Sequence, residues 1–272
     1  MNFTQKLNHI SKKNNSNLVI GLDTDLKKIP DHFLKFENPV SEFNKLVIDV
    51  TKDLCAGYKL NIAFYEFLEE KGIQAVRESL NSISDDMIKI CDAKRGDLDN
   101  TAEMYAATFF DKYNFDSVTI SPYMGTDSVL PFIKRKNKHV FVLALTSNKS
   151  SADFELLKAG DKFLYEHVTE KILSAGTEDN IGFVFGANYT SEIKEFSAKH
   201  PRVSLLIPGI GAQGNDIDLL MENITTENFV INSSRNIIYA SEKSDDLNSI
   251  SNSIRSAAMK VNVTINNKNQ FH

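Results

Sequence analysis

The stretch Met87-Ile-Lys-Ile-Cys-Asp-Ala-Lys-Arg-Gly-Asp97 decides the fold that the sequence predicts. Its first part, Met87–Ala93, is a short and mainly apolar run, which is typical of a parallel strand covered on both faces. Its second part carries charged residues and a glycine directly where that strand would end. A buried strand that opens into a charged loop is therefore the unit to look for in the rest of the chain.

The same unit recurs along the sequence. Helical patterns lie between the apolar runs, as in the segment 43–54, whose apolar residues form one amphipathic stripe. The expected strands are Leu18–Leu22, Gly57–Ile62, Met87–Ala93, Ser117–Ile120, His139–Leu145, Ile181–Gly186, Val203–Ile207 and Phe229–Asn232. Further helices are expected from Asn100 (as an N-cap with Glu103) to about Tyr113, and over Ser151–Ser174, Ser191–Ala198 and Asp245–Met259.

Eight strands that alternate with helices fit two α/β architectures, a (β/α)8 TIM barrel and a doubly wound open sheet. The chain contains no internal linker and no Pro/Gly-rich boundary, which favours one closed barrel. We therefore expect a single domain over residues 1–272, in which about 262–272 form a polar, frayed C-terminal tail.

Composition narrows the functional classes. The chain has 31 Lys and Arg residues against 36 Asp and Glu, a formal charge of -5, and no basic cluster, which argues against nucleic acid as a partner. Apolar runs such as Val140–Leu145 are too short to cross a membrane, and the polar start of the chain does not resemble a signal peptide, so a cytoplasmic location is expected. The two cysteines and six histidines lack metal-ligand spacing, so we expect no metal.

A barrel of this type has its active site at the C-terminal ends of the strands. Asp92 and Lys94 are two residues apart on one expected strand and share a face, and Lys59 and Asn61 do the same one strand earlier. Alternating Lys and Asp side chains would keep each other ionised and form a fixed electrostatic template in which Lys94 can deliver a proton.

Taken alone, D-x-K is more often a solvated strand end than a catalytic pair. Charged residues at adjacent strand ends, namely Lys59, Asp23 and Asp97, favour the catalytic interpretation. Asp97 follows Gly96, where the chain has already turned, so it either curls back or reaches the site of a neighbouring subunit.

The loop Gly209-Ile-Gly-Ala-Gln-Gly214 matches the G-x-G-x-x-G pattern, but too few residues follow it to complete a dinucleotide-binding domain. A phosphate site is the better interpretation, because loops after the seventh and eighth strands of TIM barrels commonly bind phosphate. Arg235, after the expected eighth strand, offers a guanidinium group for the same anion. The alternative is a plain tight turn beside a surface charge.

Together these motifs resemble the orotidine 5′-phosphate decarboxylase family, and most of all its longer bacterial and protozoal subgroup. The resemblance runs from about residue 15 to residue 245. The motifs that carry it are Gly21-Leu-Asp23, Tyr58-Lys59, Asp92-Ala-Lys-Arg-Gly-Asp97-Leu98 with Thr101, Ser121-Pro-Tyr-Met-Gly125, Pro208-Gly-Ile-Gly-Ala-Gln213-Gly214 and Ser233-Ser-Arg235.

The resemblance implies a carboxy-lyase that converts orotidine 5′-monophosphate to UMP and CO₂, the last step of de novo pyrimidine biosynthesis, without a metal or an organic cofactor. Lys94 would be the proton donor to C6 of the pyrimidine, and Asp92 would face the departing carboxylate. Lys59 would complete the charged array with Asp97, which would come from the partner subunit of a homodimer.

The resemblance also implies the substrate-binding residues. Asp23, Asn61 and Thr101 would contact the ribose, Thr101 from the partner subunit, and Ser147 would face the pyrimidine edge. Gln213, in the loop that ends at Gly214, would bridge base and phosphate, and Arg235 would hold the phosphate. This chain departs from the family at Asn236, where glycine is frequent, which affects the expected phosphate contacts.

Two other functions remain open at this point. Related barrels that are metal-dependent sugar-phosphate decarboxylases or aldolases also carry D-x-K-x-x-D, although Lys59 would repel a cation here. A non-enzymatic barrel that binds a phosphate sugar would keep the anion-binding loops without the chemistry.

Overall fold

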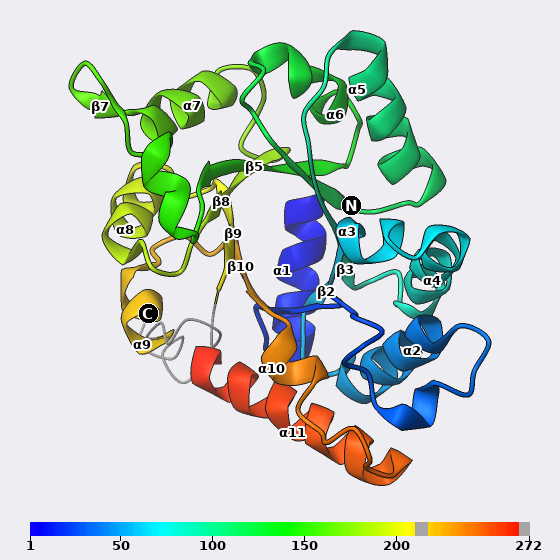
Figure 1. Ribbon diagram of the computed structural model, residues 1–272. Helices are drawn as coiled ribbons and strands as arrows, with labels where there is room; N and C mark the ends of the chain where they lie inside the picture. Colours follow the sequence, from blue (N-terminus) through cyan, green and yellow to red (C-terminus); the bar gives the residue numbers. More distant parts are fainter. Residues whose placement is uncertain (210–216, 267–272) are drawn as a thin grey trace.

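The computed structural model describes residues 1–209 and 217–266. Within these ranges, eight parallel strands close a barrel in the order β1-β2-β3-β4-β5-β8-β9-β10. Figure 1 shows this barrel with the helices around it. The strands are β1 Leu18–Gly21, β2 Gly57–Asn61, β3 Ile88–Arg95, β4 Ser117–Ile120, β5 His139–Leu145, β8 Ile181–Phe185, β9 Ser204–Pro208 and β10 Phe229–Ser233. The predicted (β/α)8 barrel is confirmed, and each expected strand lies within two residues of an observed one.

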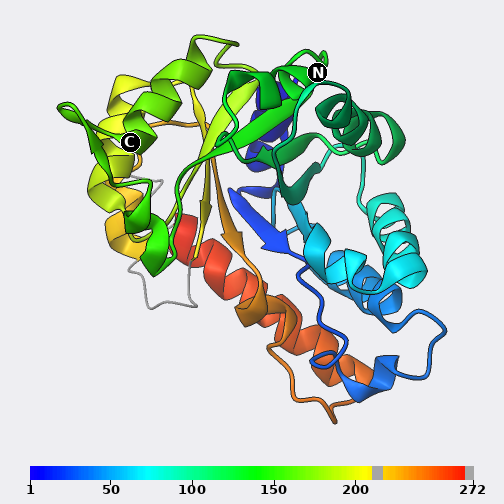
Figure 2. The same cartoon turned by 45° about the horizontal axis from the view of Figure 1, so that its top comes forward.

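Most helices surround the barrel as a ring, which Figure 2 shows from a second direction, whereas α1 lies at one end of the barrel. They are α1 Phe3–Asn14, α2 Pro39–Thr51, α3 Ile62–Glu66, α4 Glu69–Ser82, α5 Asp99–Ala106, α6 Leu130–Ile133, α7 Leu164–Leu173, α8 Thr190–Lys199, α9 Ile217–Asn223, α10 Arg235–Ile238 and α11 Leu247–Asn266. Short 3-10 turns cover Asp31–Phe33, Thr126–Ser128 and Lys149–Asp153, and a π-helical turn, Ala107–Lys112, continues α5. Strand residues such as Leu18, Val140 and Val142 are completely buried, as the apolar runs predict for strands covered on both faces.

Helix α1 packs at the N-terminal ends of the strands. The Phe3 ring stacks on His139, the first residue of β5, at 4.3 Å between centroids, and Lys6 Nζ lies 2.7 Å from Asp116, which precedes β4. Asn2 and Gln5 begin the helix with a reciprocal capping box. One end of the barrel is thereby covered, so a ligand enters from the other end.

Three expectations about helices are wrong. Ser151–Ser174 is not one helix: the 3-10 turn Lys149–Asp153 leads into the hairpin of β6 (Lys158–Ala159) and β7 (Lys162–Phe163), and α7 follows. Gly160, at φ +70° between the two short strands, permits this turn.

The other two corrections concern helix ends. Asn100 is not the N-cap of α5: the N-cap is Leu98, two residues earlier, and the helix begins at Asp99. The C-terminal tail does not fray from Asn262, because α11 continues to Asn266 with Ile265 fully buried and the Asn266 amide donating to the Asn15 carbonyl.

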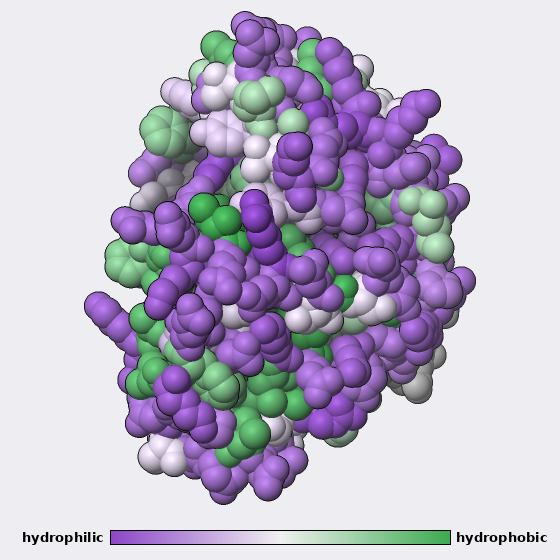
Figure 3. All heavy atoms as spheres, turned by 90° about the vertical axis from the view of Figure 1, so that its right-hand side faces the viewer, coloured by the Kyte–Doolittle hydropathy of each residue, from purple (hydrophilic) through white to green (hydrophobic). Residues whose placement is uncertain are grey.

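On the side of α2, α4 and α5, the surface that Figure 3 shows is mainly hydrophilic, and hydrophobic side chains form separate patches between polar ones. No helix in the described ranges combines the length and apolar character that a membrane span requires.

Candidate active site

A cavity of about 550 Å³ lies at the C-terminal ends of the barrel strands, where the sequence places the site. Charged side chains from β1–β3 and their following loops line one part of it, and apolar side chains from β5, β8 and β9 line another. The charged residues are Asp23, Lys59, Asp92 and Lys94, and the apolar ones include Leu143, Val184 and Leu206. The cavity therefore offers both an ionic and an apolar surface to one ligand.

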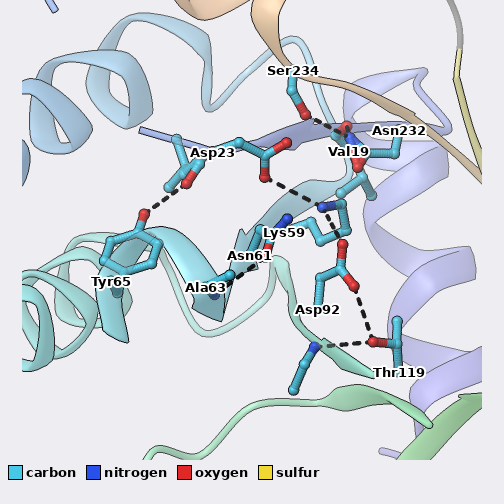
Figure 4. Close-up of polar contacts among 12 residues, drawn as sticks. Val19, Asp23, Lys59, Asn61, Ala63, Tyr65, Asp92, Thr119, Asn232 and Ser234 are labelled. Carbon is cyan, nitrogen blue, oxygen red and sulfur yellow. Dashed lines mark hydrogen bonds and ion pairs between the residues drawn. The ribbon is translucent and has the colours of Figure 1, made fainter. Parts of the chain in front are cut away.

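The four charged side chains form an alternating chain, which Figure 4 shows in part. Lys59 Nζ lies 3.4 Å from Asp23 Oδ1 and 2.9 Å from Asp92 Oδ2, and Lys94 Nζ lies 2.6 Å from Asp92 Oδ1. The parallel register of β2 and β3, with Asn61 opposite Asp92, brings the two lysines to either side of one carboxylate. The pairing that the sequence predicts between neighbouring strand ends is thus observed for these four residues.

Burial and charge act in opposite directions on the inner residues of this chain. Burial alone would lower the pKa of Lys59, but the carboxylates of Asp23 and Asp92 outweigh it and raise that pKa above its usual value. Burial likewise works to raise the pKa of Asp92, and the ammonium groups of Lys59 and Lys94 instead lower it well below its usual range. Both residues are therefore charged at neutral pH.

Strand β3 does not run evenly into this site. Its register against β4 shifts between Cys91 and Arg95, and Lys94 adopts φ +48°, a left-handed conformation that side chains other than glycine rarely take. The Thr119 hydroxyl on β4 donates to Asp92 Oδ1 at 3.1 Å. Sequence reasoning missed Thr119, and its only available signal was a polar side chain at an inward position of a buried strand.

Two further predicted residues, Ser147 and Arg235, also line the cavity. Arg235 is the first residue of α10 and is exposed, and no carboxylate in the described part of the chain pairs with its guanidinium. Gln213 and Gly214 lie outside the described residues, while Gly209, before them, has φ +101° and lines the cavity.

Three predicted residues do not line the cavity. Asn61, on β2, lies opposite Asp92 of β3. Its Oδ1 accepts a hydrogen bond from the Ala63 amide at 3.3 Å and thereby caps α3. Asp97 accepts the amide of Leu98 at 2.8 Å, and Thr101 is exposed on α5. The structure of the single chain therefore does not bring Asp97 or Thr101 to the charged array.

The loop after β5 adds side chains that the sequence did not indicate. Glu155 accepts hydrogen bonds from the backbone amide of Thr146 at 2.7 Å and from the Thr146 hydroxyl at 2.8 Å. These bonds hold the segment after the 3-10 turn Lys149–Asp153 against the end of β5, beside Ser147. Phe154, which is 61% exposed, also lines the cavity. Their signal was hidden because this stretch was expected to be helical.

Among the residues that the structure describes, no three His, Cys, Asp or Glu side chains gather as a set that would hold a metal ion. Asp23 and Asp92 each face Lys59 instead. The charges at the ends of β1–β3 are therefore paired with one another, while Arg235 lines another part of the cavity.

Comparison with known proteins gives a consistent result. The family model for orotidine 5′-phosphate decarboxylase / HUMPS matches residues 16–250. Proteins named orotidine 5′-phosphate decarboxylase from Christiangramia forsetii and Flavobacterium johnsoniae are 45% and 43% identical over 89% of this chain, and over 91% and 90% of their own lengths. The solved Leishmania donovani OMP decarboxylase superimposes with a TM-score of 0.83 at 33% identity, covering 98% of this chain and 99% of that one. These matches confirm the resemblance seen in the sequence motifs, and the chain belongs to the orotidine 5′-phosphate decarboxylase / HUMPS family.

Proposed function

We propose that this protein is a carboxy-lyase that converts orotidine 5′-monophosphate to UMP and CO₂, the last step of de novo pyrimidine biosynthesis. The observation that carries the proposal is the Lys94 ammonium, held 2.6 Å from Asp92 in a cavity that Arg235 also lines. One cavity thus offers a proton donor in a charged array and a cation for a phosphate. The proposal invokes no metal and no organic cofactor. It also implies that the enzyme works in the cytoplasm, where the nucleotide is made.

The chemistry requires charge stabilisation at C6 of the pyrimidine. The bond between C6 and the carboxylate breaks, CO₂ leaves, and the bonding electron pair stays on C6. Lys94 then transfers a proton from Nζ to C6 and regains one from solvent. Because the ammonium interacts more strongly with the developing carbanion than with the neutral ring, it stabilises the transition state more than the ground state.

The other members of the array prepare Lys94 for this step. Asp92 orients the Lys94 ammonium through the 2.6 Å contact, and it faces the departing carboxylate. Lys59 neutralises Asp92 from the opposite side at 2.9 Å. Fixed charges of this kind need little reorganisation as the reaction proceeds.

The substrate's remaining parts are assigned to the rest of the site. Arg235 would bind the phosphate together with Gln213 and Gly214, as a guanidinium matches the geometry of phosphate oxygens. Asp23 and Asn61 would bind the ribose, and Ser147, on the cavity wall, would face the pyrimidine edge. The apolar wall at Leu143, Val184 and Leu206 suits one edge of a planar ring.

We also propose that the active enzyme is a homodimer in which Asp97 and Thr101 enter the partner's site. Two observations support this. Neither residue lines the cavity of its own chain, and large apolar side chains are exposed in the same sequence regions: Leu98, Met104, Tyr123 and Met124 are 43%, 62%, 84% and 47% exposed. Exposed apolar side chains of this kind mark surfaces that a partner covers.

The decisive experiment follows the loss of the orotate absorbance when orotidine 5′-monophosphate is added to purified protein, with and without a chelator. We expect full turnover in both conditions. Lys94→Ala should abolish turnover and still bind UMP, whereas Lys12→Ala, at an exposed position on α1, should behave as wild type.

Each competing function has its own signature in that experiment. A metal-dependent sugar-phosphate enzyme would lose its activity in the chelator, and a phosphate-sugar binding protein would bind UMP without any turnover. Turnover that survives in Lys94→Ala would disprove the role given to Lys94.

A further inference from the structure

We propose that Thr119 is a positioning residue whose hydroxyl fixes the geometry of the Asp92–Lys94 pair. Thr119 belongs to β4, is 1% exposed and lines the cavity beside the charged array. The inference rests on the function proposed above and deepens it, since it names what holds the proton donor in place.

The hydrogen bonds of Thr119 carry the argument. Its Oγ1 accepts the backbone amides of Ala93 at 3.0 Å and Lys94 at 2.9 Å, and it donates to Asp92 Oδ1 at 3.1 Å, a contact drawn in Figure 4. A hydroxyl group offers one proton and two lone pairs. All three are used here, and each is directed at a residue of the Asp92-Ala93-Lys94 segment.

The need for this hydroxyl comes from the bulge in β3. Cys91 pairs with Val118 and Arg95 with Ile120, so three residues, 92–94, stand opposite Thr119 alone. An ordinary strand pair cannot satisfy the extra backbone amides of such a bulge. The Thr119 side chain does so instead, in the place of a backbone carbonyl.

The bulge in turn sets where Lys94 points. Lys94 adopts φ +48°, a conformation that persists only where the surroundings impose it. The hydrogen bond from the Lys94 amide to Thr119 is one such constraint, and the contact from Thr119 to Asp92 fixes the carboxylate that Lys94 faces. Removal of the hydroxyl would free the backbone of the donor and the side chain of its partner at once.

The test compares Thr119→Val, which keeps the shape and removes the hydroxyl, with Thr119→Ser, which keeps the hydroxyl. We expect Thr119→Val to lower kcat about 10²-fold, as a misplacement of about 1 Å does. The KM for orotidine 5′-monophosphate and the affinity for UMP should stay close to wild type, because Arg235 and the ribose contacts are untouched. Thr119→Ser should retain a kcat close to wild type.

Thr226→Val is the matched control for lost stability. The buried Thr226 hydroxyl also accepts a backbone amide, that of Asn228 at 3.1 Å, and donates to the Pro201 carbonyl at 2.8 Å. It lies before β10, at the covered end of the barrel, so its loss should lower the melting temperature and leave kcat unchanged below that temperature.

Three results would overturn the inference. Thr119→Val could keep the wild-type kcat, Thr119→Ser could lose as much kcat as Thr119→Val, or Thr226→Val could lose as much kcat as Thr119→Val. In each of these cases wild-type turnover still supports the proposed function. Absence of turnover in the wild-type protein would remove the proposed function and this inference together.

Discussion

The Lys59 ammonium lies 2.9 Å from Asp92 Oδ2, and the two side chains are only 5% and 11% exposed. Loss of one partner from a buried ion pair leaves the other charge without compensation, which typically costs about 3–5 kcal/mol. Lys59 is also the only cation of this array that contacts Asp23 among the described residues. Its removal would therefore affect two carboxylates.

We accordingly predict that Lys59→Met lowers the free energy of unfolding by about 3–5 kcal/mol and abolishes turnover. Urea unfolding followed by circular dichroism measures the first effect, and the absorbance assay measures the second. Lys13→Met is the control, because Lys13 pairs with Asp86 at 2.6 Å at the surface, where such pairs contribute below about 1 kcal/mol. Equal losses in both variants would contradict the assigned burial effect.

The same ion pair predicts a pH dependence. The pKa of Asp92 is lowered on folding, so its stabilisation is present above the unfolded pKa of about 3.9 and is lost as the pH falls through the lower folded value. The pKa of Lys59 is raised, so its stabilisation is present below about 10.4 and is lost as the pH rises through the higher folded value. The difference in unfolding free energy between wild type and Lys59→Met should thus be constant from about pH 5 to 9 and shrink at both extremes.

His139 predicts a second pH effect, at the covered end of the barrel. Burial lowers the pKa of His139 to about 3, and its ring stacks on Phe3 of α1. The folded state therefore keeps this residue neutral, whereas the unfolded chain binds a proton near pH 6.5. Stability falls with decreasing pH between these values, by about 1.4 kcal/mol per pH unit from this group.

His139→Gln should remove that contribution. Urea unfolding from pH 4 to 7 measures this contribution. The unfolding free energy of wild type minus that of His139→Gln should decrease as the pH falls. Asn81→Gln, at an exposed position of α4, changes no titratable group, so its difference from wild type should stay constant with pH. A difference for His139→Gln that does not change with pH would show that His139 is not neutral in the folded protein.

The sequence predicts the barrel because its strands carry their signal locally. Val140–Leu145 is apolar on both faces, a pattern that only a strand covered on two sides requires. Charged residues cluster where such runs end. The array of Asp23, Lys59, Asp92 and Lys94 follows from the same rule, since parallel neighbours bring their C-terminal ends together.

Features that depend on pairing between distant segments were not accessible in this way. The bulge at Lys94 and the role of Thr119 arise from the register of β3 against β4, which no local pattern encodes. Helix α1 is polar in composition, and its packing against the end of the barrel involves the stacking of Phe3 on His139, a residue distant in sequence. Asp97 stays a prediction because its proposed site belongs to a second chain.

Glu155 predicts a separable effect on substrate binding. Its carboxylate accepts two hydrogen bonds from Thr146, through the backbone amide at 2.7 Å and the hydroxyl at 2.8 Å, next to Ser147. Hydrogen bonds to charged groups contribute about 1.5–3 kcal/mol. Glu155→Ala should therefore raise KM for orotidine 5′-monophosphate about tenfold or more, with a smaller change in kcat.

Steady-state kinetics on Glu155→Ala measure this split. Glu195→Ala, at an exposed position of α8, provides the control and should match wild type. A loss confined to kcat would mean that the segment held by Glu155 positions the proton donor and does not contact the pyrimidine edge.

The proposed exchange of Asp97 between subunits predicts complementation between two inactive variants. Asp97→Ala should lose turnover because each site lacks the partner's carboxylate, and Lys94→Ala should lose it because each site lacks the proton donor. In a mixed dimer, the site that keeps its own Lys94 receives an intact Asp97 from the other subunit, while the second site carries both defects. Refolding or co-expressing the two variants together should therefore restore a measurable fraction of wild-type turnover, which neither variant shows alone.

Mixing Lys94→Ala with Asp92→Ala gives the matched comparison. Because Asp92 and Lys94 contact each other within one chain, no mixed dimer of these two variants contains a complete site unless the donor pair is also exchanged. The contrary result is that the mixture of Asp97→Ala and Lys94→Ala stays inactive although mixed dimers form. Asp97 would then belong to the site of its own chain, and it would have to curl back toward the array when substrate binds.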